Sequence, residues 1–384
     1  MTTMRVLSLG NAWFPEKPGG LDRFYMELMR AFPSVGVESK GLVVGTEAVA
    51  GQTDGRITAF AAANAPLPHR LLAARRATSA LCDTMRPDLI AAHFALYAFP
   101  SLTRLRQRPF VFHFQGPWAA EGIVEGQRPM AARVQAAIES AVYRRADRVI
   151  VLSRAFGDEV VRRYDVDPAR VRVIPGGVNT AAFDNLPSRA DARATLGWPA
   201  DRPLLLCVRR LQRRMGLEDL LDAVAAIRHR HADLQVMIAG RGPLRDALQG
   251  RIDALGLGAN VRLLGFLPDA QLPLAYRAAD LSVVPTVALE GFGLITLESL
   301  AAGTPVLVTP VGGLPEAVAG LAADMILPAS GPQALAAGLD AALRGELALP
   351  DAQHCRDHVE QHHRWDSIAA KVRDVYAQAM EARG

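Results

Sequence analysis

Two glutamates separated by seven residues mark the part of the sequence best suited to bind a charged ligand. Glu290 stands beside Gly291 and Gly293, and Glu298 follows within a leucine-rich run that predicts a helix. Glycines let backbone amides approach a ligand closely, and the start of a helix offers unpaired N–H groups to a diphosphate. Carboxylates accept hydrogen bonds from paired sugar hydroxyls. We therefore expect the two glutamates to address different parts of one ligand.

A lone glutamate on a helix is most often a solvent-exposed charge, and this is the alternative interpretation of Glu298. Its neighbours include Leu294, Leu297 and Leu300, so this helix is mostly apolar. A carboxylate in apolar surroundings needs a partner. We therefore interpret Glu298 as a binding residue rather than a surface charge.

The composition limits the classes of protein to which the chain can belong. At about 100–200 residues per domain, 384 residues predict two domains. The net charge is only +4 and the arginines are spread along the chain, which argues against nucleic acid binding. Three cysteines without a CxxC pair argue against zinc or a disulfide framework and favour a reducing compartment. No signal peptide or long apolar run is found, so we expect a cytoplasmic protein without a membrane span.

Short apolar runs alternate with amphipathic stretches, a pattern typical of parallel sheets covered by helices. The predicted strands lie at 5–9, 43–44, 89–93, 110–114, 148–152 and 171–174, and then at 204–208, 235–239, 261–264, 281–284, 306–308 and 325–327. The two series are separated by a Pro-Gly-Gly turn at 175–177 and by a proline-containing stretch at 186–203. The sequence thus predicts an α/β protein with two doubly wound domains, and ligands of such sheets bind at the carboxyl ends of the strands.

The motif from Glu290 to Glu298, followed by Ala-Gly-Thr-Pro-Val at 302–306, resembles the signature of the retaining GT-B glycosyltransferases of family four. The resemblance extends over nearly the whole chain. It includes the glycine loop at 19–20, the interdomain segment at 173–183, the loop at 240–244 and the closing helix from Trp365. It implies an N-terminal Rossmann-like acceptor domain (1–185, with helix 365–384), a Rossmann-like donor domain (186–364), and a deep cleft between them.

The resemblance also implies roles for individual residues. Glu298 would hold the ribose hydroxyls of a nucleotide-sugar donor, and Glu290 would hold the transferred sugar. The residues expected to bind the donor are Gly20, Gly242, Phe292, Gly293, Leu294 and Glu298.

A basic segment follows the predicted strand 204–208. The family pattern has an arginine and, five residues later, a lysine before glycine; Arg210 matches the arginine, but Met215 occupies the lysine position. Fixed cations that meet the leaving diphosphate lower the barrier, and methionine supplies none. We expect Arg213 or Arg214 to replace the charge, with Arg214 favoured because it is nearer. The alternative is that both are surface charges and the enzyme is weak.

The predicted strand 110–114 runs into Gln115 and Gly116. The family often has a histidine immediately before this glycine, in contact with the sugar, whereas this chain has Gln115. His113 lies two residues earlier and therefore on the same side of the strand. We expect Gln115 to take the sugar contact and His113 to support it, with a buried structural histidine as the alternative.

The sequence shows no dedicated nucleophile and no cluster with metal-ligand spacing, so we expect neither a metal nor a cofactor. The mechanism that the resemblance implies needs no protein nucleophile. The acceptor hydroxyl attacks from the face of the leaving group, and the diphosphate takes its proton. Three alternatives remain: a nucleotide-sugar 2-epimerase, a non-catalytic sugar-nucleotide binding protein, and a NAD-dependent dehydrogenase. The last is disfavoured because Gly240 and Gly242 are not followed by the third glycine of the dinucleotide fingerprint.

The substrates are less well defined by the sequence than the reaction. We favour a UDP-sugar over a GDP-sugar as the donor. The acceptor can be a glycan, a lipid-linked molecule or a small molecule. The arginine-rich run 70–76 leaves open a weak peripheral contact with the inner face of a membrane, although an ordinary amphipathic helix is the favoured interpretation.

Overall fold

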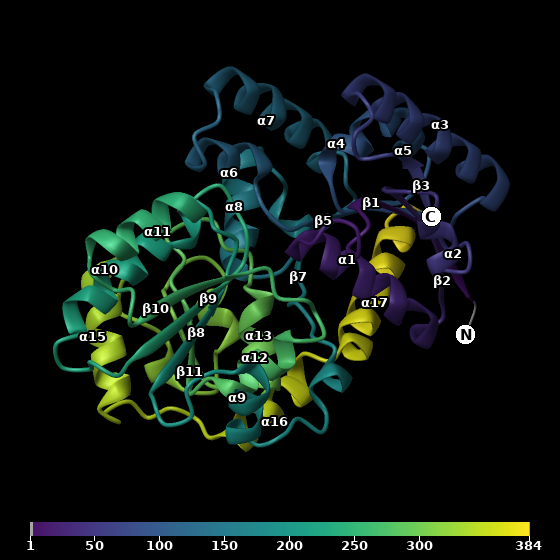
Figure 1. The fold of residues 1–384 in the computed structure, drawn as a ribbon. Coiled ribbons are helices and arrows are strands. Elements are labelled where there is room, and N and C mark those ends of the chain that lie inside the picture. Colours follow the sequence, from purple (N-terminus) through teal and green to yellow (C-terminus); the bar gives the residue numbers. More distant parts are fainter. Residues whose placement is uncertain (1–2, 384) are drawn as a thin grey trace. The chain divides into compact units, whose positions relative to one another are not determined.

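The computed structural model describes residues 3–383, which fold into two compact units (Figure 1). The first unit runs through Gly177 and also takes in the C-terminal segment from Trp365, whereas the second spans Val178–Arg364. The expected boundary at residue 185 therefore falls inside the second unit. None of the helices described within residues 3–383 is long and apolar enough to cross a membrane.

The first unit is built on a parallel sheet of seven strands in the order β3-β2-β1-β4-β5-β6-β7. Their bounds are β1 Met4–Ala12, β2 Val37–Val44, β3 Ile57–Ala61, β4 Leu89–Ala92, β5 Phe110–Phe114, β6 Arg148–Val151 and β7 Val171–Val173. Every residue of β4 and β5 is buried, as expected for central strands of a parallel sheet covered on both faces.

Helices cover both faces of this sheet, and β5 shows how its residues alternate between them. Phe112 and Phe114 contact Tyr143 on one side, whereas His113 contacts Phe24 and Tyr376 on the other. The helices of the unit are α1 Gly20–Ala31, α2 Ala48–Gln52, α3 Leu67–Met85, α4 Ala95–Ala98, α5 Leu102–Leu105, α6 Trp118–Val124, α7 Pro129–Tyr143, α8 Arg154–Tyr164 and α17 Trp365–Glu381.

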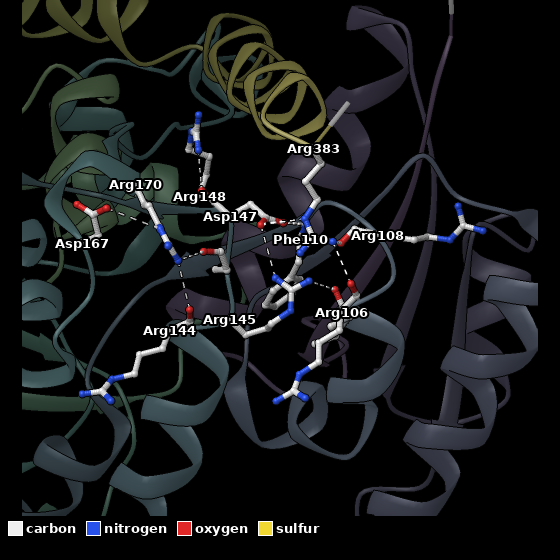
Figure 2. Close-up of polar contacts among 12 residues, drawn as sticks. Arg106, Arg108, Phe110, Arg144, Arg145, Asp147, Arg148, Asp167, Arg170 and Arg383 are labelled. Carbon is white, nitrogen blue, oxygen red and sulfur yellow. Dashed lines mark hydrogen bonds and ion pairs between the residues drawn. The ribbon is translucent and has the colours of Figure 1, made fainter.

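The C-terminal helix α17 is an integral part of the first unit. It packs against α1, β5 and β6, and its buried face repeats at Ile368, Val372 and Tyr376, four residues apart. Just beyond it, the Nε of Arg383 donates to Asp147 Oδ1 at 3.0 Å, where Figure 2 shows the two side chains meeting. The helix from Trp365 thus packs as part of the first unit.

The second unit contains a parallel sheet of five strands in the order β10-β9-β8-β11-β12. Their bounds are β8 Leu204–Val208, β9 Gln235–Ala239, β10 Val261–Gly265, β11 Leu281–Val284 and β12 Val306–Val308. The helices are α9 Arg189–Leu196, α10 Leu217–Ile227, α11 Arg245–Ala254, α12 Leu272–Ala278, α13 Leu294–Ala301, α14 Leu314–Ala317, α15 Pro332–Leu343 and α16 Ala352–His362. Two Rossmann-like parallel sheets confirm the predicted fold class.

Two segments differ from the strands predicted by sequence. β3 was not predicted, and it pairs with β2 at the edge of the first sheet. The expected strand at 325–327 is instead a short 3-10 turn, Ala323–Met325, followed by a single bridge between Ile326 and Val308. One bridge is too little pairing to extend the second sheet to a sixth strand.

Candidate functional site

The loops that follow β8, β11 and β12 meet at one edge of the second sheet, because the carboxyl ends of parallel strands lie together. The N–H of Val287 donates to the Arg214 carbonyl at 3.0 Å, which joins the first two loops. The N–H of Gly313 donates to the Glu290 carbonyl at 2.9 Å, which joins the second and third. The loop that carries Glu290 is therefore held from both sides.

Glycines permit this close packing of loops. Gly216 has φ +70°, and a Cβ there would lie 1.8 Å from the carbonyl oxygen of Pro285. Gly312 has φ +56°, and a Cβ there would lie 2.0 Å from the carbonyl oxygen of Glu290. No side chain fits at these separations, and L-residues rarely adopt these φ values.

Glu290 is partly buried and forms an ion pair with the buried Arg209. The Arg209 Nη2 donates to Glu290 Oε2 and also to the hydroxyl of Thr286, which is itself fully buried. Burial alone would raise the pKa of Glu290, but the charge and hydrogen bond of Arg209, with the charges of Arg214 and Arg210, hold this pKa below its usual value. Glu290 is thus an ionised acceptor at neutral pH.

Glu298 lies in α13 and only 6% of its surface is exposed. The hydroxyl of Tyr276, from α12, donates to Glu298 Oε2 at 3.0 Å. This is the kind of partner that a carboxylate on an apolar helix requires. Gly293 caps the start of α13 with φ +79°, Phe292 before it is buried, and Leu294, the first residue of the helix, is partly exposed.

The basic segment divides into buried and exposed arginines. Arg210 and Arg213 are exposed, whereas Arg214 is buried and its Nη1 donates to the Leu289 carbonyl at 2.9 Å. Met215, which is 3% exposed, belongs to the hydrophobic core of the unit. Arg214 therefore supports the Glu290 loop directly, and the side chain at 215 packs into the interior.

The two glycines expected to approach phosphates have different surroundings. A Cβ at Gly242 would lie 2.3 Å from the Leu211 carbonyl oxygen, so the loop after β9 requires glycine to pack against the loop after β8. Gly20 is the first residue of α1 and has open space where its Cβ would be. The packing of the first unit thus leaves room for a side chain at residue 20, and a phosphate contact at Gly20 stays a prediction.

The structure places His113 inside the first unit, where 1% of its surface is exposed. Its Nε2 lies 2.7 Å from the Tyr376 hydroxyl, and its ring stacks on His93 at a centroid distance of 4.1 Å. Burial lowers the pKa of His113 to about 3, which keeps the imidazole neutral. Gln115 is partly exposed, and its Nε2 lies 3.4 Å from His93 Nδ1. The side chain in contact with Gln115 is thus His93, while His113 ties β5 to α17.

A buried glutamate that the sequence analysis did not single out organises the segment after Gln115. Glu139 accepts hydrogen bonds from the N–H of Trp118 at 2.8 Å and of Ala119 at 3.2 Å, and from the hydroxyls of Tyr143 and Tyr164 at 3.0 and 2.9 Å. Burial raises the pKa of Glu139 even though these donors favour its ionised form. Glu139 thus fixes the start of α6 against α7. The sequence offered only one signal, an acidic residue on a mostly apolar helix.

Among the residues described, 3–383, no group of three or more His, Cys, Asp or Glu side chains is arranged to hold a metal ion. A metal-independent reaction stays a prediction from the sequence.

Two family descriptions match this chain, in consecutive parts of the sequence. Residues 188–377 match the family described as "Glycosyl transferases group 1", and residues 18–182 match "Glycosyltransferase Family 4". Similar sequences include a glycosyltransferase of Methanocaldococcus jannaschii, 34% identical over 62% of this chain and 61% of that protein. Another is the D-inositol 3-phosphate glycosyltransferase of Streptomyces avermitilis, 34% identical over 68% of this chain and 58% of that one. The chain thus matches about three fifths of the length of these relatives.

Solved structures share the fold along almost the whole chain. The sucrose-phosphate synthase of Thermosynechococcus elongatus superposes with a TM-score of 0.80 at 24% identity, covering 99% of this chain and all of that one. The Anabaena protein HepE, solved in complex with UDP and glucose, gives a TM-score of 0.77 at 20% identity, covering 98% of this chain and all of that one.

Proposed function

Because the chain belongs to glycosyltransferase family four, we propose that it transfers a sugar, with retention of configuration, from a nucleotide diphosphate sugar to an acceptor hydroxyl. The observation that carries this proposal is the placement of two carboxylates, the buried Glu298 and the partly buried Glu290, beside a cluster of arginines where the strands of the second unit end. The carboxylates suit the hydroxyls of a donor, and the arginines suit its diphosphate.

In the proposed site each group has one task. Glu298, fixed by Tyr276, accepts the ribose hydroxyls, and Glu290 accepts a hydroxyl of the transferred sugar. Arg210, exposed and near enough to influence Glu290, meets the leaving diphosphate. Arg214 adds positive charge from its buried position beside the loop. Fixed cations of this kind stabilise the charge that develops as the sugar–phosphate bond breaks.

In the proposed step, the bonds formed and broken and the proton transferred involve only the donor and the acceptor, so no protein nucleophile is needed. The acceptor oxygen forms a bond to the anomeric carbon on the face that the diphosphate leaves, and the bond from that carbon to the diphosphate oxygen breaks. The proton of the acceptor hydroxyl passes to the departing diphosphate. Gln115 of the first unit, which is partly exposed beside His93, is the proposed sugar contact from that unit. His113 contributes by holding β5 against α17.

We favour UDP-sugars as donors, and the Anabaena structure with UDP and glucose supports this choice by its shared fold. The acceptor is a hydroxyl of a glycan, a lipid-linked molecule or a small molecule. A polyol phosphate belongs among the acceptors to be assayed, because several relatives are named as D-inositol 3-phosphate glycosyltransferases.

A cytoplasmic location with weak contact to the inner face of a membrane is a further part of this proposal. Leu67 and Leu72 of α3 are exposed, and Arg75 and Arg76 of the same helix are exposed as well. Apolar side chains beside arginines suit an anionic lipid surface. Co-sedimentation with phosphatidylserine vesicles, but not with phosphatidylcholine vesicles, is the expected result, and no sedimentation with either would contradict it.

The proposed activity is tested by release of UDP from a panel of UDP-sugars with a panel of acceptors, with the anomeric configuration of the product read by proton NMR. Glu290→Gln should lose most of the activity, and Glu346→Gln, an exposed glutamate of the same unit, should retain it. An isomerised nucleotide sugar formed without acceptor would show an epimerase instead. Donor binding without turnover across the panel would show a binding protein.

A further inference from the structure

We propose that Arg209 is a positioning residue of the donor site, which holds one oxygen of the Glu290 carboxylate and thereby presents the other oxygen to a hydroxyl of the transferred sugar. This inference rests on the proposed function and deepens it. Arg209 stands one position before Arg210, where the family pattern begins, so the pattern implies no role for it.

The backbone of Arg209 is fixed tightly enough for such a role. It lies directly after β8, its N–H donates to the Ala239 carbonyl at 2.8 Å, and its own carbonyl oxygen lies against Gly240. A Cβ at Gly240 would come within 1.8 Å of that oxygen. The backbone from which the Arg209 side chain extends is therefore fixed at the edge of the sheet.

The guanidinium is equally well held at its far end. Arg209 is 8% exposed, and its Nη2 reaches both Thr286 and Glu290. The backbone carbonyl of Thr286 in turn accepts a hydrogen bond from the Thr309 hydroxyl at 2.6 Å. Loops after three different strands thus converge on one ion pair. An exposed ion pair costs side-chain entropy to order, whereas this pair is ordered before a ligand arrives.

The contacts of Glu290 are unequal at its two oxygens. Arg209 and Thr286 both donate to Oε2, and among the described residues no hydrogen bond reaches Oε1. A carboxylate with two available oxygens can accept two neighbouring hydroxyls, whereas one oxygen held by a guanidinium leaves a single directed acceptor. Glu290 is therefore set to recognise one hydroxyl of the sugar.

Charge supports the same arrangement. Three arginines, at 209, 210 and 214, act on the single carboxylate of Glu290. Arg209 both pairs with and hydrogen-bonds that carboxylate, whereas Arg210 and Arg214 act on it through their charges. Without Arg209, the carboxylate would draw on one of those two other cations.

The test compares the affinities of UDP and UDP-glucose by calorimetric titration of the full chain. Arg209→Met should weaken UDP-glucose by about tenfold, ~1.4 kcal/mol, while UDP, which has no transferred sugar, should change by less than about threefold. Arg209→Lys keeps the positive charge but loses the planar guanidinium with its several N–H donors. Its affinity for UDP-glucose should therefore lie between those of the wild type and Arg209→Met. Arg344→Met, an exposed arginine on the surface of the same unit, should bind both as wild type does.

Acidity gives a second readout that a merely structural role would not alter. In the wild type, Glu290 stays ionised, so the affinity for UDP-glucose, whose diphosphate does not titrate in this range, should hold steady as the pH falls from about 8 to about 5. Removal of Arg209 lets burial raise the pKa of Glu290, so the affinity of Arg209→Met for UDP-glucose should fall relative to that of the wild type as the pH falls. If Arg209→Met does not fold, Arg209→Lys and Thr286→Val carry the same comparison.

The outcomes separate this inference from the proposed function. Equal weakening of UDP and UDP-glucose would overturn the inference, because Arg209 would then act on the nucleotide itself. Wild-type affinities with an unchanged pH profile would also overturn it. A wild-type chain that binds neither ligand would instead count against the proposed function.

Discussion

Restoring the lysine that the family pattern has at residue 215 should harm this protein rather than improve it. The pattern alone suggests that Met215→Lys would return a cation to the diphosphate. The structure places the Met215 side chain in the hydrophobic core with Leu211, Leu217 and Leu220. An ammonium there would be buried away from the site and without a partner among these neighbours.

The cost can be worked out from the pKa that a buried lysine adopts. Burial lowers a lysine pKa from about 10.4 by roughly three units, and each unit corresponds to about 1.4 kcal/mol. Met215→Lys should therefore destabilise the second unit by ~4 kcal/mol at neutral pH. Met215→Leu, which keeps the volume and the apolar character, should cost less than about 1.5 kcal/mol.

The pH dependence identifies the cause. The pKa of the lysine is lower in the folded chain than in the unfolded chain, so the penalty is present at neutral pH and below, and it fades as the pH rises toward the unfolded pKa of about 10.4. Thermal unfolding of both variants at neutral pH and near pH 10 measures this. If Met215→Lys is as stable as Met215→Leu and binds UDP more tightly than wild type, the side chain reaches the site and the reasoning fails.

Three further substitutions test contacts of the two units. Glu139→Ala leaves four donors, three of them buried, without their acceptor and should lower the free energy of unfolding by ~3–5 kcal/mol; an unchanged melting temperature would contradict this. Tyr276→Phe removes the hydroxyl that fixes Glu298 and should weaken UDP about three- to tenfold by calorimetry, whereas unchanged affinity would show that Glu298 needs no such support. Arg383→Ala removes the contact with Asp147 and should speed amide hydrogen exchange in the last turns of α17; identical exchange would mean that the packing of the helix suffices.

The alternation of apolar runs was enough to predict most of the two sheets, because central parallel strands are buried on both faces and appear as continuous apolar segments. The apolar pattern does not predict β3, because this strand lies at a sheet edge and three of its five residues are only partly buried. The prediction of a strand at 325–327 is wrong for the opposite reason, since burial there is not accompanied by strand pairing. Its apolar residues are largely buried, but they form only one bridge to β12.

In the site, the local motif was predictable and its long-range partners were not. The spacing of Glu290 and Glu298 identifies a loop and the helix that follows it. By contrast, Arg209 and Glu290 are 81 residues apart, and Tyr276 and Glu298 are 22 residues apart. Such pairs depend on which strand ends lie side by side, and strand order is not encoded in local spacing. The core position of Met215 is likewise a consequence of how the turn before α10 packs.

The central claim is that Glu298 and Arg210 of the second unit hold a nucleotide diphosphate. Calorimetric titration of the wild type, Glu298→Ala, Arg210→Ala and the control Arg344→Met with UDP and GDP tests it most directly. We expect one nucleotide, UDP, to bind the wild type and the control equally, and both site variants to bind it at least about tenfold more weakly, ~1.4 kcal/mol. A wild type that binds neither nucleotide, or site variants that bind as the control does, would contradict it.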